Sequence, residues 1–143
     1  GIPFVFDPGQ GLPMFNGEEL QRFVSQASWV AVNDYEGKML AERTGQSLAE
    51  LSCGHLRGLI ETLGAEGCNV YVQGEVTHVP GVKAEAVVDP TGCGDAFRGG
   101  LLFGLSQGWD LVKSVALANR IGAIKIAVAG PQNYTLDRAA LGV

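Results

Sequence analysis

The sequence lacks the features that mark disulfide-stabilised, zinc-binding or membrane-spanning proteins. Its three cysteines, Cys53, Cys68 and Cys93, are an odd set, and no two of them have CxxC spacing. We therefore expect reduced thiols rather than a disulfide framework or a zinc site. No run of about 18 apolar residues could span a membrane, and no basic segment followed by an apolar one marks a signal peptide. These absences favour a cytoplasmic protein.

Positive charge is scarce as well. Lys and Arg number 10 against 15 Asp and Glu, which gives a formal net charge of −5. This balance argues against a general nucleic-acid or anionic-membrane binder, although a local anion site stays compatible with it. Apolar residues make up 46% of the chain and charged residues 17%, which is typical of a globular protein. The 143 residues suffice for one domain with a core, and no repeat, low-complexity tract or linker divides them.

Strand and helix patterns alternate along the chain. Short apolar runs at 2–6, 29–32 and 58–63 predict strands, the first of them buried. Asn16, Asn33 and Ser47 stand where the N-caps of the intervening helices are expected. Residues 69–72 and 75–79 predict a hairpin that turns at Gln73-Gly74. The later segments are a short strand at 86–88, a helix at 94–105, an apolar helical segment at 110–129 broken near Gly122, and one or two helical turns at 136–141.

This order of elements predicts an α/β fold. Strands that alternate with helices favour a mostly parallel sheet flanked by helices. The hairpin adds an antiparallel edge to that sheet.

The segment VVDPTGCGDAFRGG, residues 87–100, joins a predicted strand to a predicted helix through a glycine-rich loop. Glycines let successive backbone N–H groups turn toward one point, and a helix N-terminus adds partial positive charge. The backbone N–H groups of Gly92, Cys93 and Gly94 are therefore candidates for an anion site. The loop has no Lys, so it is not a Walker A motif, and its glycines do not have GxGxxG spacing.

Asp95 directly follows the candidate anion site and admits two interpretations. As a general base it would take a proton from a substrate hydroxyl while the adjacent amides hold the phosphoryl group under attack. As a structural residue it would cap the helix. Asp89 is open in the same way, as a cap at the strand end or as a ligand of a hard monovalent cation. Arg98, one turn into the helix, either reaches a phosphate or lies at the surface.

The residues DPTGCGDAFRGGLLFGL resemble the second signature of the ribokinase-like (PfkB) carbohydrate kinase family, whose usual core is D-T-x-G-A-G-D. The positions in register with that core are Asp89, Gly92, Gly94 and Asp95. Pro90 replaces the usual threonine, so the role of that hydroxyl is unfilled, and Cys93 replaces the common alanine. The resemblance implies that Asp95 is the catalytic base and that the amides of Gly92, Cys93 and Gly94 stabilise the transferring phosphoryl group.

A second match is Asn33-Asp34-Tyr35-Glu36, which resembles the family's N-x-x-E motif and follows a predicted strand. Its three-residue spacing lets Asn33 and Glu36 face the same site at a helix start. The resemblance implies that Glu36 organises Mg²⁺, through water, and that Asn33 lies near the phosphates. Taken alone, the pattern is also that of a helix cap followed by a first-turn glutamate.

Two further matches concern the nucleotide. Residues 62–67 resemble the family's T-x-G-x-x-G turn, with Thr62, Gly64 and Gly67 at its defined positions. Asn119 and the loop at 130–133 resemble the adenine-side helix and the loop after it. The resemblance implies that these residues bind the nucleotide. The ordinary alternatives are a strand-to-hairpin turn and a polar residue on an exposed helix face.

The resemblance spans the chain from Phe4 to Asn133 and implies a ribokinase-like fold that uses ATP and Mg²⁺. It also implies that Asp89 and the carbonyl of Thr91 help to hold K⁺. The segments GAIKIAVAGPQN and DAFRGG look most like bacterial adenosine or nucleoside kinases. The implied reaction is phosphoryl transfer from ATP to a hydroxyl of a small-molecule acceptor, a nucleoside or a sugar.

All these motifs belong to the C-terminal half of the family. Residues 1–143 are therefore identified as the ATP-binding and catalytic-base half of a ribokinase-like kinase domain. The chain also begins at Gly1 with an apolar strand pattern and no Met, so we expect a fragment, or a processed or nicked chain. The alternative is an ordinary chain whose Met was removed. An exposed first strand would need a partner, which is the missing N-terminal half or another copy.

Two other functions stay open. One is a kinase of the same family with another acceptor, such as ribose, fructose phosphate or a hydroxymethylpyrimidine. The other is a nucleotide-binding half-domain that has no catalysis alone. A Rossmann dehydrogenase is disfavoured because no GxGxxG follows the first strand with an acidic residue about 20 positions later.

Overall fold

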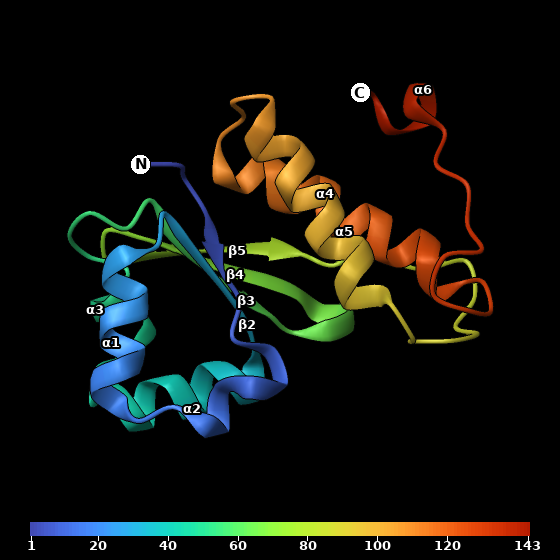
Figure 1. Cartoon of the computed structure of the whole chain (residues 1–143). Helices are drawn as coiled ribbons and strands as arrows, with labels where there is room; N and C mark the ends of the chain where they lie inside the picture. The colour runs from blue at the N-terminus through green and yellow to red at the C-terminus, as the bar shows by residue number, and fades with distance from the viewer. The chain divides into compact units, whose positions relative to one another are not determined.

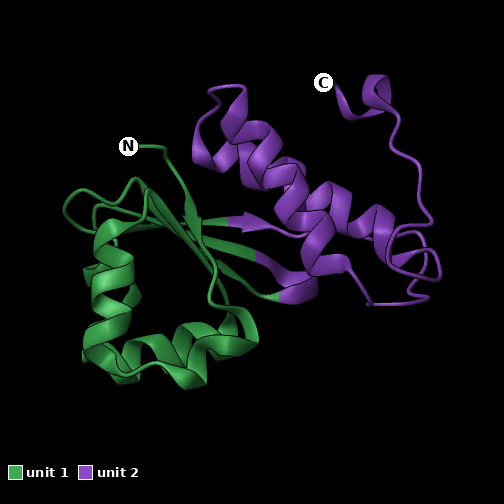
Figure 2. Ribbon diagram, in the orientation of Figure 1, with its two compact units in different colours: residues 1–63, 68–78 green, residues 64–67, 79–143 purple.

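The computed structural model describes residues 1–143. The chain divides into two compact units (Figures 1 and 2). The first unit contains residues 1–63 and 68–78, and the second contains residues 64–67 and 79–143. The assignment of residues 1–143 to a single half of a kinase domain stays a prediction, and each unit is described by itself below.

A five-stranded sheet is built on the first unit, in the spatial order β1-β2-β3-β4-β5. Its strands are β1 (Val5–Phe6), β2 (Trp29–Asn33), β3 (Gly58–Thr62), β4 (Gly67–Val72) and β5 (Glu75–Pro80). The pairs β1–β2 and β2–β3 are parallel, whereas β4 runs antiparallel to β3. The predicted α/β class, with a parallel sheet and an antiparallel hairpin at one edge, is confirmed.

Three helices of this unit lie on one side of the sheet (Figure 1): α1 (Gly17–Gln26), α2 (Asp34–Thr44) and α3 (Leu48–Leu51). Each begins with a capping box, in which the N-cap side chain and the third helical residue exchange hydrogen bonds with each other's backbone N–H. The three N-caps are Asn16, Asn33 and Ser47, as predicted. A short 3-10 helix at Gly9–Met14 precedes α1.

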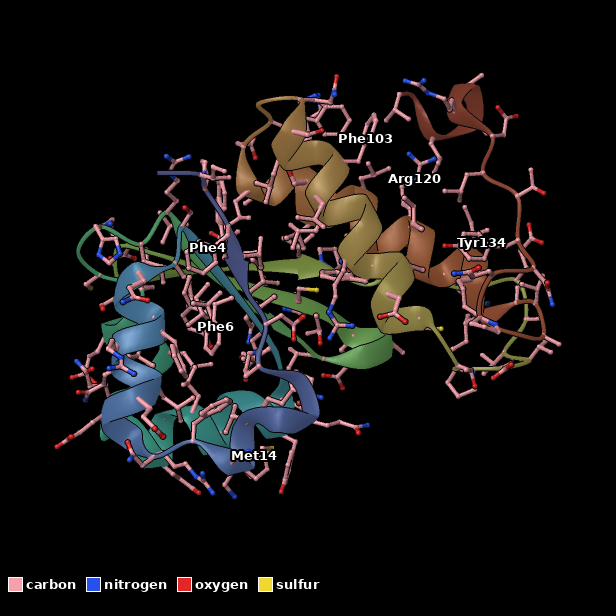
Figure 3. All side chains as sticks on the ribbon, viewed as in Figure 1. Phe4, Phe6, Met14, Phe103, Arg120 and Tyr134 are labelled. Carbon is pink, nitrogen blue, oxygen red and sulfur yellow. The ribbon has the colours of Figure 1, made fainter.

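The core of the first unit forms between these helices and the sheet. Leu20 of α1, Leu40 of α2 and Val30 of β2 are fully buried in one apolar cluster. Phe6 packs against this cluster (Figure 3), and its ring centroid lies 5.4 Å from that of Phe23. Burial of this apolar area is the main favourable term in the folding of the unit.

The hairpin between β4 and β5 turns at the predicted residues. Gln73 and Gly74 both have positive φ values, 50° and 84°. A two-residue turn with positive φ at both central residues matches the right-handed twist of the strands that it joins. The backbone N–H of Gly74 donates to Ser52 Oγ at 3.0 Å, which anchors the turn in the same unit.

The second unit is built on a pair of helices, α4 (Cys93–Ser106) and α5 (Leu111–Ile126). Their backbones approach closely at two glycines of α4. A Cβ atom at Gly100 would lie 2.9 Å from Ala118 Cα, and one at Gly104 would lie 2.6 Å from Ser114 Oγ. The short helix α6 (Arg138–Leu141) is tied to α5 by Arg120 (Figure 3), whose guanidinium donates to the carbonyls of Ala140 and Leu141 at 2.7 and 2.9 Å.

Three details of the predicted secondary structure are wrong. Residues 86–88 form no strand, because the N–H groups of Val88 and Asp89 both donate to the carbonyl of Ile126 at the end of α5. Helix α5 runs without a break through Gly122. Strand β1 is limited to Val5–Phe6, and the expected burial of residues 2–6 fails at Ile2, which is 91% exposed.

None of the helices combines the length and the apolar character that a membrane span requires.

The contact between α4 and α5 predicts different costs for two neighbouring glycines. Gly100→Ala should lower the free energy of unfolding by about 1–3 kcal/mol, because the added methyl group meets backbone of α5. Gly99→Ala is the matched control: its added Cβ would meet nothing within 4 Å, and alanine favours the helix by up to about 1 kcal/mol. Urea unfolding followed by circular dichroism measures both. Equal effects of the two substitutions would contradict this packing.

Candidate active site

Asn33 and Glu36 lie in the first unit, where β2 ends and α2 begins. Asn33 Oδ1 accepts from the N–H of Glu36 at 2.7 Å, and Glu36 Oε2 accepts from the N–H of Asn33 at 2.9 Å. This capping box keeps Glu36 buried, with 9% of its surface exposed, and fixes one carboxylate oxygen. Asn33 and Glu36 therefore do form a helix cap, which was the alternative to a functional role. The same cap also holds the Glu36 carboxylate in one orientation.

Thr62 lies beside Asn33 in the sheet. The two residues are Cα partners in the parallel pair of β2 and β3, at the carboxyl end of each strand. Carboxyl ends of parallel strands are the usual place for ligand sites in α/β proteins. The first unit thus brings together the predicted residues Asn33, Glu36 and Thr62.

The predicted turn residues Gly64 and Gly67 lie in the second unit. Gly67 has a φ of 103°, and a Cβ atom there would lie 2.1 Å from the carbonyl oxygen of Val79. Only glycine fits this close approach of two backbones. The side-chain amide of Asn119 donates to the carbonyls of Val79 and Pro80 at 3.4 and 3.1 Å. The turn and Asn119 therefore meet at the same segment, and their contact with a nucleotide stays a prediction.

The glycine loop (residues 89–94) leads into α4 and is held chiefly by Asp89. One carboxylate oxygen, Oδ1, accepts from the N–H of Thr91 at 2.9 Å, and the other, Oδ2, accepts from the N–H of Gly130 at 2.8 Å. The hydrogen bond from Thr91, then that from Gly130 and the positive charge of Lys125, lower the pKa of Asp89 from 3.8 to about 2. Asp89 is the structural cap of this loop.

Backbone geometry then sets the start of α4. Gly92 is the N-cap with a φ of 79°, and a Cβ atom there would lie 2.9–3.0 Å from atoms of Pro131. The N–H of Cys93 donates to the carbonyl of Pro90 at 3.1 Å, so it already has an acceptor inside the turn. The following N–H groups, of Gly94 and Asp95, belong to the first turn and have no acceptor within a helix. Sequence reasoning missed the N–H of Asp95.

Asp95 itself is the third residue of α4 rather than its N-cap, which removes the capping interpretation. Its side chain is 85% exposed and pairs with Arg98, whose Nη1 lies 3.3 Å from Asp95 Oδ1. A Cβ atom at Gly94 would lie 2.8 Å from Arg98 Nη1, so the guanidinium covers Gly94. Exposed ion pairs contribute little to stability, and this pair places one acid and one cation at the helix start.

Lys125 completes this part of the second unit and was not singled out by sequence reasoning. It lies in the last turn of α5, its side chain is fully buried, and its Nζ donates to the carbonyls of Asp89 and Val128 at 2.8 and 3.1 Å. A lysine inside the apolar run GAIKIAVAG was the available signal. Buried lysines are rare unless they are paired.

The donors present differ in how well they suit metal ions. No three His, Cys, Asp or Glu side chains gather around one point. Mg²⁺ in phosphoryl-transfer sites is often held by one or two carboxylates, water and substrate phosphates, and the Glu36 carboxylate fits that role. K⁺ needs several oxygen donors that replace its hydration shell. Each carboxylate oxygen of Asp89 already accepts a backbone hydrogen bond, and its carbonyl accepts from the Lys125 ammonium, so a K⁺ at this carbonyl would compete with the charge of Lys125.

The model of the pfkB family carbohydrate kinases matches residues 5–138. The chain belongs to this family. The nucleoside kinase of Burkholderia thailandensis, solved with inosine and with ADP-inosine, is 48% identical over 99% of this chain and 44–46% of its own, with TM-scores of 0.93 and 0.91. The fold is thus ribokinase-like.

Two further kinases are similar to this chain. The nucleoside kinase of Methanocaldococcus jannaschii is 28% identical over 89% of this chain and 42% of its own length. A fructokinase of Escherichia coli is 30% identical over 87% of this chain and 45% of its own length. The chain spans less than half the length of these relatives.

The bonds of Asp89 predict a specific acid sensitivity. Because the pKa of Asp89 is depressed from 3.8 to about 2 in the folded protein, its stabilising contribution is complete above the unfolded value and is lost as the pH falls through about 2. Asp89→Asn should therefore flatten the decline of unfolding free energy on acidification over that range.

Urea unfolding at a series of pH values measures this decline. Asp95→Asn is the control, because that carboxylate pairs with the Arg98 side chain instead of holding the loop backbone. Parallel acid profiles for the wild type and Asp89→Asn would contradict the assignment.

Proposed function

We propose that this chain carries the ATP-binding and catalytic-base part of a kinase that transfers a phosphoryl group from ATP to a hydroxyl of a nucleoside or sugar. The observation that supports this most is the start of α4. There, an exposed carboxylate, Asp95, stands in the first turn beside backbone N–H groups that lack helical acceptors. A base and an anion site placed together are what phosphoryl transfer to a hydroxyl needs.

Each residue at the helix start has a distinct proposed role. Asp95 takes the proton from the acceptor hydroxyl. The N–H groups of Gly94 and Asp95, with the adjacent Gly92, stabilise the negative charge on the transferring group, an electrostatic term that is usually the largest in catalysis. The N–H of Cys93 joins them only if it leaves the carbonyl of Pro90. Arg98 contributes its positive charge to a phosphate.

The remaining predicted residues are proposed to serve the nucleotide. Asn33 lies near the phosphates, and Glu36 would hold Mg²⁺, which neutralises phosphate charge when bound. The other nucleotide contacts are proposed for Thr62, Gly64, Gly67 and Asn119. K⁺ at Asp89 and Thr91 is left out of this proposal, because the donors of Asp89 are engaged.

A nucleoside is the first choice of acceptor. The Burkholderia thailandensis relative, at 48% identity, is a nucleoside kinase solved with inosine. A sugar comes second, because the Escherichia coli fructokinase is also similar. Ribose, fructose phosphate and hydroxymethylpyrimidine are the other acceptors that a substrate panel on the full natural protein would separate. A cytoplasmic location and the lack of nucleic-acid or membrane partners stay predictions from composition.

The sheet edge at β1 supports a protein partner. β1 is the outer strand of the sheet order, and the residues before it, Ile2 and Phe4, are 91% and 44% exposed. An unpaired edge with apolar side chains favours strand pairing with another segment. We assign this edge to the N-terminal half of the family fold or to another copy of the chain.

A second candidate function is nucleotide binding without catalysis. It is favoured by one fact, that the chain spans less than half the length of its relatives. This candidate predicts ATP binding with no release of ADP that depends on an acceptor.

Substitution of the proposed base tests the main proposal. In the full natural protein, Asp95→Asn should lower turnover by about 10²–10⁴, because general-base catalysis is lost, while ATP affinity is kept. Acceptor-dependent ADP release and ATP titration calorimetry measure the two quantities. Asp137→Asn is the matched control, because Asp137 is the N-cap of the short helix α6 and has no proposed role in the reaction. Turnover that survives Asp95→Asn unchanged would rule out this base.

A further inference from the structure

Lys125 is the one large buried cation-bearing side chain that the proposed reaction does not use. It is 0% exposed, and its Nζ donates to two backbone carbonyls rather than to carboxylates. The negative charge that it faces is the Asp89 carboxylate, whose pKa it helps to lower. A buried ammonium is costly unless hydrogen bonds and an opposite charge compensate it, so this lysine needs an explanation.

The two carbonyls belong to segments that converge on the glycine loop. The carbonyl of Asp89 is the first of that loop, and the carbonyl of Val128 lies just after α5. The turn that follows donates the N–H of Gly130 to Asp89 Oδ2, and Pro131 packs against Gly92. One ammonium therefore joins the end of α5 to the backbone that begins α4.

The positive charge of the Lys125 ammonium suits its position at the C-terminal end of α5. The C-terminal end of a helix carries partial negative charge, and Lys125 sits in the last turn of α5. Carbonyl oxygens that point at one spot, backed by a carboxylate, make a cation site. An ammonium is close to K⁺ in size and has the same charge, and it arrives covalently attached, so no ion has to be recruited from solution.

We infer that the Lys125 ammonium is a built-in cation that shapes the glycine loop, and that this kinase needs no K⁺ for it. This inference rests on the proposed function only in treating the loop as the phosphate site. It replaces the K⁺ expected at Asp89 and Thr91 with a side chain of the protein. Lys125 is thus a positioning residue, which acts through the loop backbone and not by contact with the substrate.

The wild-type protein gives the first test. Crystals of the full natural protein soaked in Tl⁺, a K⁺ substitute with strong anomalous scattering, should show no Tl⁺ at the carbonyl of Asp89. The thermal midpoint and the affinity for ADP should also be the same in potassium chloride and in tetramethylammonium chloride of equal ionic strength. A Tl⁺ peak at that carbonyl, or tighter ADP binding in K⁺, would overturn the inference.

The variant Lys125→Met gives the second test, because it keeps an apolar stem and removes the charge. Its ADP affinity should fall by about 10–100-fold, the range seen when a group that orients binding residues without touching the ligand is removed. K⁺ should restore part of that loss, whereas tetramethylammonium, which is too large, should not. Lys83→Met is the control, because Lys83 is an exposed lysine of the same unit.

The outcomes separate this inference from the proposed function. A loss of ADP affinity that K⁺ does not restore would make Lys125 a merely structural residue and overturn the inference. If Lys125→Met does not fold, the Tl⁺ and salt measurements on the wild type decide it. A protein that binds ADP and shows no K⁺ effect, yet never phosphorylates an acceptor, would refute the proposed function and leave the lysine assignment standing.

Discussion

The bonds that converge on Asp89 are the constraint on which the candidate phosphate site depends. Its N–H donates to the end of α5, its carbonyl accepts from Lys125, and its two carboxylate oxygens accept from Thr91 and Gly130. Every hydrogen-bonding group of this residue is thus engaged with backbone or with a buried ammonium. These bonds fix the position of the turn at Gly92 and of the first turn of α4, which follow Asp89 in the chain.

The charges at the start of α4 decide whether Asp95 can stand beside an anion site. A carboxylate next to an anion site is unfavourable by itself, because like charges repel. Two groups of positive character lie at Asp95: the N-terminus of α4, in whose first turn it stands, and the Arg98 guanidinium, 3.3 Å away. The Lys125 ammonium adds a third positive group at the other end of the loop, on Asp89. The chain belongs to the pfkB family and is similar to nucleoside kinases. A carboxylate beside an anion site is the arrangement on which the proposed phosphoryl transfer depends.

Local chemistry explains what the sequence predicted well. Helix caps and tight turns depend on hydrogen bonds and φ values within a few residues, so the sequence alone can predict them. This holds for the caps at Asn16, Asn33 and Ser47 and for the turn at Gln73-Gly74. The parallel sheet followed from the alternation of strands and helices. The position of Asp95 in a first helical turn followed from the glycine loop before it.

Long-range contacts explain what the sequence did not show. Val88 does not form the expected strand because its N–H donates to the carbonyl of Ile126 at the C-terminal end of α5. Gly122 did not break α5, because a single glycine costs a helix only about 1 kcal/mol, which the burial of other α5 residues such as Ile121 and Val115 can offset. The hydrogen bond from Lys125 to Asp89 joins residues far apart in the chain. The apolar run around Lys125 indicates that this lysine is buried, but no local pattern indicates which group it meets.

A crystal structure of the full natural protein with ADP, a metal-fluoride mimic of the transferring phosphoryl group, and a nucleoside tests the central claim most directly. We predict that the Asp95 carboxylate lies within about 3 Å of the acceptor hydroxyl, with the mimic held by N–H groups of Gly94 and Asp95. A mimic bound away from the start of α4, or an acceptor hydroxyl out of reach of Asp95, would contradict it.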